Sequence, residues 1–244
     1  MTIPNREVLD ISHHNSIDSW ADIKAAGIVG VIHKATQGRS YTDPTYLKRA
    51  APAMRATLQW GAYHFADNSD VEAQVNHFLA VVGGDNETLY ALDWEDNGNS
   101  TMSFDQARQF LQLIEQKIGR NRCVLYSGNT AKEAMGSRAD PYFGAHRLWL
   151  AQYSNNPVPQ ASWDTYWLWQ YSDGNAGPEP HSCPGVTGEV DTNSWPGTDA
   201  ELVAQWTGAP VPTPPPVGVP TITINVSPPG SARVIVTGAQ SPLN

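Results

Sequence analysis

Short apolar runs and longer amphipathic stretches alternate along most of this 244-residue chain. Eight of the short runs are rich in β-branched or aromatic residues and end in polar groups, which is typical of β-strands. We therefore predict strands over residues 7–12, 30–36, 60–66, 88–95, 123–129, 147–153, 166–172 and 188–193.

The stretches between the early strands have the apolar spacing of helices. The sequences Ser-Asp-Val-Glu at 69–72 and Ser-Phe-Asp-Gln at 103–106 have the form of capping boxes that begin a helix. Pro52 lies inside another such stretch and is expected to kink or split it. We predict helices over residues 19–26, 45–57, 69–82, 103–118, 130–135 and 199–206.

Alternation of strands and helices predicts parallel strands that are joined by right-handed crossovers. No convincing helix separates the three strands between residues 147 and 193, so about five helices are expected to cover the strands. We predict an α/β fold, a TIM-like barrel of the form (β/α)5(β)3, over residues 1–208. The active site of such a barrel lies at the carboxyl ends of its strands.

The composition changes after Gly208. Residues 209–219 are rich in proline, which predicts a stiff linker. Residues 220–244 contain two further strand patterns, at 221–226 and 233–237. Two strands do not form a stable domain alone. We therefore predict a short β-rich tail, and the sequence leaves its role open.

Two acids, Asp93 and Glu95, stand at the end of the predicted strand 88–95. Side chains two residues apart on a strand point to the same side, so both carboxylates are expected to face the mouth of the barrel. Burial and mutual repulsion raise the pKa of one, which then serves as a general acid while the other stays ionised. Glycoside hydrolysis requires that division of roles. The plainer interpretation is a solvated acidic loop, because Asp96 follows directly.

Asp10 and Asp191 end the first and last predicted strands in the same way. These strands are neighbours in a closed barrel, so we predict that both acids join Asp93 and Glu95 in one catalytic cluster. The alternative for Asp10 is a structural role at a turn. Polar or aromatic residues near other strand ends are candidates for substrate binding: Lys34, Tyr63, His64, Tyr126, Gln152, Tyr153, Trp169, Gln170 and Asn193.

The composition narrows the range of partners. The chain has 15 Lys and Arg against 24 Asp and Glu, and this net charge of −9 argues against a nucleic-acid-binding face. No apolar run is long enough for membrane insertion. Nine Trp and nine Tyr include rings that suit sugar binding, although most are expected in the core. The histidines and the two cysteines, Cys123 and Cys183, have no metal-binding spacing, so we expect no metal and no cofactor. Whether the cysteines pair stays open.

Seven segments resemble, in order, those of the family 25 glycoside hydrolases, the Chalaropsis-type lysozymes. They are LDISHHN at 9–15, GVIHKATQG at 30–38, GAYHFA at 61–66, LDWE at 92–95, LWLAQY at 148–153, LWQY at 168–171 and VDTN at 190–193. One such segment is a weak match, whereas seven in order are a specific one. The chain departs from many relatives in having Gln37 where they have Glu, and its tail matches no wall-binding repeat.

The resemblance implies a barrel that hydrolyses the β-1,4 bond between N-acetylmuramic acid and N-acetylglucosamine in the glycan strands of bacterial peptidoglycan. It implies that Glu95 is the general acid and that Asp93 orients the reacting 2-acetamido group in a retaining, substrate-assisted reaction. Asp10 and Asp191 would complete the acidic cluster, with Tyr63 close to the sugar.

Two other functions stay open. One is a different N-acetylhexosamine glycosidase, chitinase-like, on the same carboxylates. The other is a non-catalytic glycan-binding barrel, which would not need Glu95. The first residues lack a secretory signal pattern, so we expect a monomer that is made in a host cytoplasm and released onto the wall as an endolysin is, or exported by another route. A protonated Glu95 predicts an activity optimum on the acid side of neutral.

Overall fold

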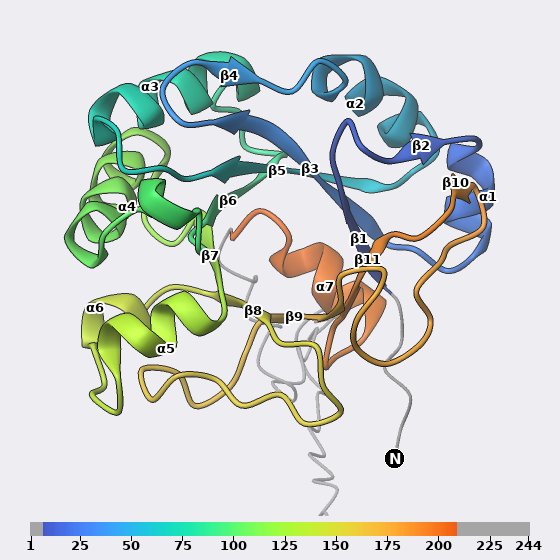
Figure 1. Ribbon diagram of the computed structural model, residues 1–244. Helices are drawn as coiled ribbons and strands as arrows, with labels where there is room; N and C mark the ends of the chain where they lie inside the picture. Colours follow the sequence, from blue (N-terminus) through green and yellow to red (C-terminus); the bar gives the residue numbers. More distant parts are fainter. Residues whose placement is uncertain (1–6, 209–244) are drawn as a thin grey trace, which may run out of the picture. The chain divides into compact units, whose positions relative to one another are not determined.

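The predicted strands close into a ring (Figure 1). The computed structural model describes residues 7–208. All eight predicted strands are present, each within three residues of its expected bounds. In order around the ring they are β1 (Val8–Ile11), β3 (Gly30–Gln37), β5 (Gln59–Phe65), β6 (Leu89–Asp93), β7 (Cys123–Ser127), β8 (Leu148–Ala151), β9 (Leu168–Ser172) and β11 (Asp191–Ser194).

The ring closes between the first and last strands, as expected, but their directions differ. The strands from β1 to β9 pair in parallel, whereas β11 is antiparallel to both β9 and β1. The parallel direction that strand–helix alternation predicts therefore does not extend to the last strand. β9 and β11 are joined without a helix, and an antiparallel pair does not need the crossover connection that a parallel pair requires. Three short strands lie beside the ring: β2 (Ser16–Ile17), β4 (Tyr41–Thr42) and β10 (Val186–Thr187).

Helices surround the ring in Figure 1, and one lies within its outline. They are α1 (Trp20–Ala25), α2 (Tyr46–Arg55), α3 (Val71–Val82), α4 (Phe104–Ile118), α5 (Asn129–Met135), α6 (Pro141–Gly144) and α7 (Asp199–Gln205), with a 3-10 turn η1 (Gly98–Ser100). Six of these were expected, and the short α6 was not. Its start is fixed by Asp140, whose side chain accepts hydrogen bonds from the backbone of Tyr142 and Phe143.

The expected helix starts are correct for α4 and one residue early for α3. Ser103 and Gln106 form the predicted capping box. At α3 the cap is Asp70, whose side chain accepts from the backbone N–H of Ala73. The expected split of α2 at Pro52 does not occur, and the helix continues to Arg55. Buried residues on both sides of the proline hold the two halves against the barrel.

Alternate strand residues divide the core into two layers. One layer lies between the strands and the outer helices. The other fills the barrel and includes Val8, Ile32, Val124 and Trp149, together with Leu202 and Trp206 near the carboxyl end of α7. The indole N–H of Trp206 donates to the carbonyl of Trp60 at 2.7 Å. Thus α7 closes one end of the barrel, and the carboxyl ends of the parallel strands form the open mouth.

The predicted linker at 209–219 and tail at 220–244 lie outside the described residues. Within residues 7–208, no helix is both long enough and apolar enough to span a membrane. Cys123 is a free, buried thiol in β7, so it forms no disulfide with Cys183.

Candidate active site

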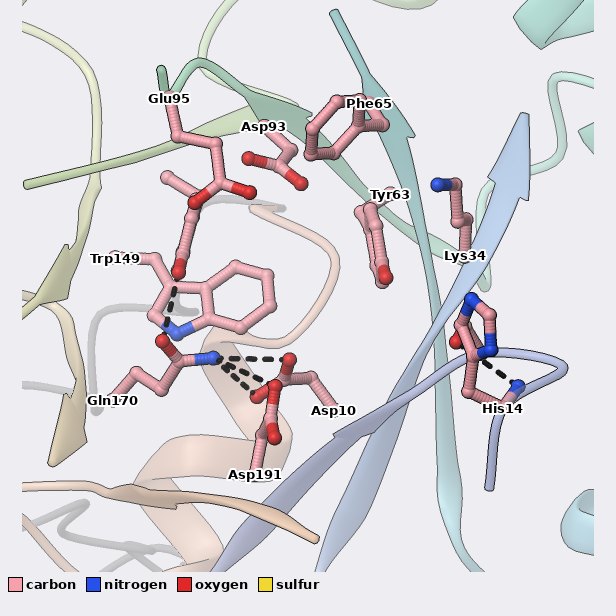
Figure 2. Close-up of a pocket in the computed structure, with 12 residues that line it drawn as sticks. Asp10, His14, Lys34, Tyr63, Phe65, Asp93, Glu95, Trp149, Gln170 and Asp191 are labelled. Carbon is pink, nitrogen blue, oxygen red and sulfur yellow. Dashed lines mark hydrogen bonds between the residues drawn. The ribbon is translucent and has the colours of Figure 1, made fainter. Parts of the chain in front are cut away.

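A pocket of about 140 Å³ opens at the mouth of the barrel (Figure 2). Eight of the thirteen candidate residues from the sequence line it: Asp10, Lys34, Tyr63, Tyr126, Asp93, Glu95, Gln170 and Asp191. In Figure 2, Asp93 and Glu95 approach the pocket from one side and Asp10 and Asp191 from another. The predicted acidic cluster therefore forms, from residues up to 181 positions apart in the chain.

The antiparallel direction of β11 places Asp191 at the mouth. We expected Asp191 to end its strand, but it is the first residue of β11. Asp10 and Asp191 are paired in register between β1 and β11. Because β11 runs against the other strands, its beginning lies beside their carboxyl ends. The expected position was correct for a reason that the sequence did not reveal.

Gln170 holds Asp10 through a chain of hydrogen bonds. The hydroxyl groups of Tyr126 and Tyr153 donate to Gln170 Oε1 at 2.7 Å and 3.0 Å. This fixes the amide, so Gln170 Nε2 donates to the two Asp10 carboxylate oxygens at 3.0 Å and 2.9 Å. Asn193 Nδ2 donates to Asp10 Oδ2 at 2.8 Å. Three N–H bonds thus converge on one buried carboxylate, and such bonds favour its ionised form.

The environments of Asp10 and Asp191 act differently on the pKa values of the two acids. Burial, with the charge of Asp10 as the next cause, raises the pKa of Asp191 to about 9. Burial also raises the pKa of Asp10, but the hydrogen bonds from Asn193 and Gln170 oppose that rise. The hydrogen bonds from Asn193 and Gln170 therefore favour the charge on Asp10 and the proton on Asp191.

The pKa values of Asp93 and Glu95 are both raised. Burial, followed by the charge of Asp10, raises the pKa of Glu95 to about 7, while Lys34 opposes the rise. Burial, followed by the charge of Glu95, raises the pKa of Asp93 well above its ordinary value. Asp93 Oδ1 is buried, and no group within residues 7–208 donates a hydrogen bond to it. A carboxylate oxygen in that state is ready to accept a bond from a ligand.

Lys34 brings a cation to the acidic pocket. Its Nζ donates to Gln37 Oε1 at 2.7 Å and lies 4.5 Å from the centroid of the Phe65 ring. Burial lowers the pKa of Lys34, and the charges of Asp93 and other acids oppose this. Gln37 is a neutral amide, so it orients Lys34 without neutralising it.

Five candidate residues do not line the pocket: His64, Trp169, Asn193, Gln152 and Tyr153. Period-two alternation turns His64 outward next to the inward Tyr63, and His64 is buried between Thr36 Oγ1 at 2.7 Å and Gln74 Oε1 at 3.0 Å. Trp169 likewise points away from the pocket beside Gln170, and its indole N–H donates to the carbonyl of Gln152.

Asn193 is fully buried behind Asp10, where it also accepts from the Trp149 indole N–H at 2.6 Å. Its place is to support Asp10 rather than to contact a ligand. Gln152 and Tyr153 line a second hollow that adjoins the pocket and shares Glu95 with it.

Four lining residues were not among the candidates: Ser12, His14, Phe65 and Trp149. For two of them, the alternation of side chains along a strand could have predicted a place in the pocket. Phe65 stands two residues after Tyr63 on β5, and Trp149 alternates with the outward Leu148 and Leu150 on β8. Ser12 and His14 lie in the turn after β1, where alternation gives no guidance. Within residues 7–208, no three His, Cys, Asp or Glu side chains are grouped to hold a metal ion.

A closed barrel with buried carboxyl groups at its mouth, one of them with a pKa raised to about 7, has the arrangement of a glycoside hydrolase. The sequence agrees with that class. The model of the glycosyl hydrolases family 25 matches residues 9–179, and the chain belongs to this family.

Relatives of known description support the assignment along most of the chain. Lysozyme M1 of Streptomyces globisporus is 28% identical over 211 residues, which cover 80% of this chain and 69% of that protein. The N,O-diacetylmuramidase of Chalaropsis sp. is 30% identical over 186 residues, which cover 68% of this chain and 88% of that protein.

The fold agrees with a solved structure of the same kind. The bacterial lysozyme from Streptomyces coelicolor superposes with a TM-score of 0.73 at 28% identity, covering 85% of this chain and 99% of that chain. The expected α/β barrel and the expected family are both confirmed. The chain is a glycoside hydrolase with the fold and the sequence features of lysozymes.

Proposed function

We propose that this chain is a muramidase that hydrolyses the β-1,4 bond between N-acetylmuramic acid and N-acetylglucosamine in bacterial peptidoglycan. In this proposal Glu95 is the general acid and the 2-acetamido group of the substrate is the nucleophile. The observation that carries it is Glu95 at the pocket mouth with a pKa raised to about 7. An acid of that pKa holds its proton in the weakly acidic range and releases it readily to a leaving oxygen.

Asp93 is assigned to the acetamido group. Its buried Oδ1 lacks a hydrogen-bond donor within residues 7–208, and an acetamido N–H would supply one. The bond to Asp93 holds the acetamido oxygen toward C1 and stabilises the positive charge that the group acquires. The Asp93 carboxylate then has a role without attacking the sugar itself, in contrast to the usual pair of protein carboxylates.

The proposed reaction has two steps. First, Glu95 gives its proton to the glycosidic oxygen while the C1–O bond breaks and the acetamido oxygen bonds to C1. Second, Glu95 takes a proton from water, and the water oxygen bonds to C1 and restores the acetamido group. Two displacements at C1 retain its configuration. Ionised Asp10 favours positive charge at the reacting sugar, and Tyr63 closes the pocket between the two pairs of acids.

The choice of muramic acid over other hexosamines rests on the family and on the names of the relatives. A chitinase-like activity is the other outcome of the test below. A glycan-binding barrel without catalysis is disfavoured, because a binder has no use for a carboxyl group with a raised pKa beside a second buried acid.

The test compares Glu95→Gln with Glu72→Gln, an exposed residue on α3, in the clearing of a peptidoglycan suspension. Loss of the general acid should lower the rate by about 10²- to 10⁴-fold, whereas Glu72→Gln should match the unaltered protein. Full activity of Glu95→Gln would refute the mechanism. Mass analysis of the new reducing ends distinguishes a muramidase from a glucosaminidase, and chitin oligosaccharides test the chitinase-like alternative.

We also propose that the chain acts as a monomer and reaches the wall by endolysin-like release. One chain supplies all twelve residues that line the pocket. Light scattering on the purified protein tests the monomer. Expression inside a bacterial cell, with and without a membrane-permeabilising partner, tests the release route, since lysis without the partner would contradict it.

A further inference from the structure

A second hollow adjoins the catalytic pocket, and we call it the outer groove. Its cavity of about 370 Å³ is lined by Glu95, Asp96, the β7–α5 turn at 128–130 and the end of β8 at 151–153. This volume lies within the range of small-ligand sites. Glu95 lines both hollows, so its side chain forms part of the boundary between them. Figure 2 places Glu95 on the side of the pocket opposite Lys34.

This position of Glu95 determines which sugar each hollow can take. A general acid stands beside the oxygen that joins two sugars, so one sugar lies on each side of it. The reacting sugar needs Asp93, which lines the pocket and not the outer groove. We propose that the outer groove is the leaving-group subsite and that it binds an N-acetylhexosamine through Tyr153, Asn129 and Thr130. This inference rests on the proposed role of Glu95.

Tyr153 supplies a fixed aromatic surface. Its side chain is 39% exposed, while its hydroxyl group donates to Gln170 Oε1 at 3.0 Å. The bond at the tip holds the ring in place, so the ring loses little freedom when a ligand packs on it. The apolar C–H face of a pyranose is a suitable partner for such a ring.

Asn129 and Thr130 supply polar groups with unused bonding capacity. Their side chains make no hydrogen bond within residues 7–208, and both line the outer groove. An amide and a hydroxyl group together match the acetamido and hydroxyl groups of a hexosamine. Gly128 brings this turn close to β8, because a Cβ at that position would lie 2.5 Å from the carbonyl oxygen of Ala151.

Gln152 has a different part in the outer groove. Its Oε1 accepts from Lys132 Nζ at 2.9 Å, and its Nε2 donates to the carbonyl of Asn156 at 2.9 Å. The amide is therefore committed to the loop after β8. We assign Gln152 to shaping the outer groove and not to holding the sugar.

The experiment compares two substrates with the same reacting disaccharide. One is a tetrasaccharide of alternating N-acetylglucosamine and N-acetylmuramic acid, whose leaving group is a disaccharide that begins with N-acetylglucosamine. The other is the 4-methylumbelliferyl glycoside of the disaccharide, whose leaving group is a phenol. The readout is the ratio of kcat/KM on the tetrasaccharide to kcat/KM on the aryl glycoside.

Asn129→Ala and Tyr153→Leu should each lower this ratio by about tenfold or more, the scale of one lost pocket contact. Tyr153→Phe keeps the ring and loses only the bond that holds it, so its ratio should fall less than that of Tyr153→Leu. Asn155→Ala is the matched control for Asn129→Ala. Asn155 is exposed on the loop after β8, which also carries Tyr153, and it does not line the outer groove. Equal losses on both substrates, or unchanged ratios, would overturn the inference.

A second readout needs only the tetrasaccharide. Asn129→Ala should raise KM more than it lowers kcat, because it removes a contact that the bound substrate already makes. An unchanged KM would also overturn the inference. Glu95→Gln separates the two proposals. If it cleaves the tetrasaccharide as fast as the unaltered protein, the proposed function fails, whereas a normal Glu95→Gln result with unchanged ratios refutes only the leaving-group subsite.

Discussion

Asp10 and Asp191 face each other in register across the antiparallel pair β1–β11, at the seam where the barrel closes. Their environments differ, because burial and the neighbouring Asp10 raise the pKa of Asp191 to about 9. Asp10 instead receives N–H bonds from Gln170 and Asn193. Closure of the fold therefore creates a pair of acids in which Asp191 favours the proton and Asp10 favours the charge.

This separation predicts unequal effects of two matched substitutions. Asp191→Asn replaces a protonated acid by a neutral amide of the same shape, so kcat/KM should fall by less than about tenfold. Asp10→Asn removes the charge and leaves the N–H groups of Gln170 and Asn193 facing an amide. Each unsatisfied donor costs about 1–3 kcal/mol. Steady-state kinetics on peptidoglycan and urea unfolding measure both effects, and a larger loss in Asp191→Asn would contradict the assignment.

The pKa of Glu95, raised to about 7, predicts the alkaline limit of activity. The acid works only when protonated, so kcat/KM should fall above pH 7 and approach a loss of about tenfold per pH unit. A pH profile from 4 to 9 on soluble glycan fragments measures this limit. A rate that keeps rising above pH 8 would exclude Glu95 as the acid.

Two substitutions should move that limit in opposite directions. The cation of Lys34 stabilises the ionised form of Glu95, so Lys34→Met should raise the pKa of Glu95 and extend activity to higher pH. The charge of Asp10 has the reverse effect, so Asp10→Asn should move the limit to lower pH. Lys48→Met, on the exposed side of α2, is the control for loss of a lysine. Profiles with the same limit in all variants would show that these charges do not tune Glu95.

His64 predicts a pH-dependent contribution to stability. Burial lowers the pKa of His64 to about 4, with the Gln74 hydrogen bond opposing the change. The folded pKa is below the ordinary value of about 6.5, so the contribution is complete above pH 6.5 and is lost as pH falls toward 4. The raised pKa values of Asp191 and Glu95 act in the opposite direction, since stability rises as these groups gain protons.

The measurement must therefore compare the unaltered protein with His64→Gln at each pH. The difference in their free energies of unfolding should shrink by about 2 kcal/mol between pH 7 and pH 5. Urea titrations at the two pH values provide it. A difference that does not change with pH would mean that His64 is not held neutral in the fold.

The sequence predicts where strands and helices lie much better than it predicts which strand residues face the interior of the barrel. All eight strands follow from local apolar patterning, and Ser103 with Gln106 begins α4 as expected. The sequence nevertheless predicts His64 and Trp169 as binding residues beside Tyr63 and Gln170. Alternation requires that neighbours on a strand face opposite sides, but only the position of the barrel axis decides which side is the interior.

What the sequence determined by itself is local: the order of the strands, most helix ends, and the presence of Asp93 and Glu95 two residues apart at the end of one strand. Its motifs also determined the family. Tertiary structure alone decided the direction of β11, the bonds of Gln170 to Asp10 and the place of Trp149 in the pocket. These features depend on contacts between residues far apart in the chain, and the charge on each buried acid depends on all its neighbours at once. Propensity and spacing describe only what lies nearby in sequence.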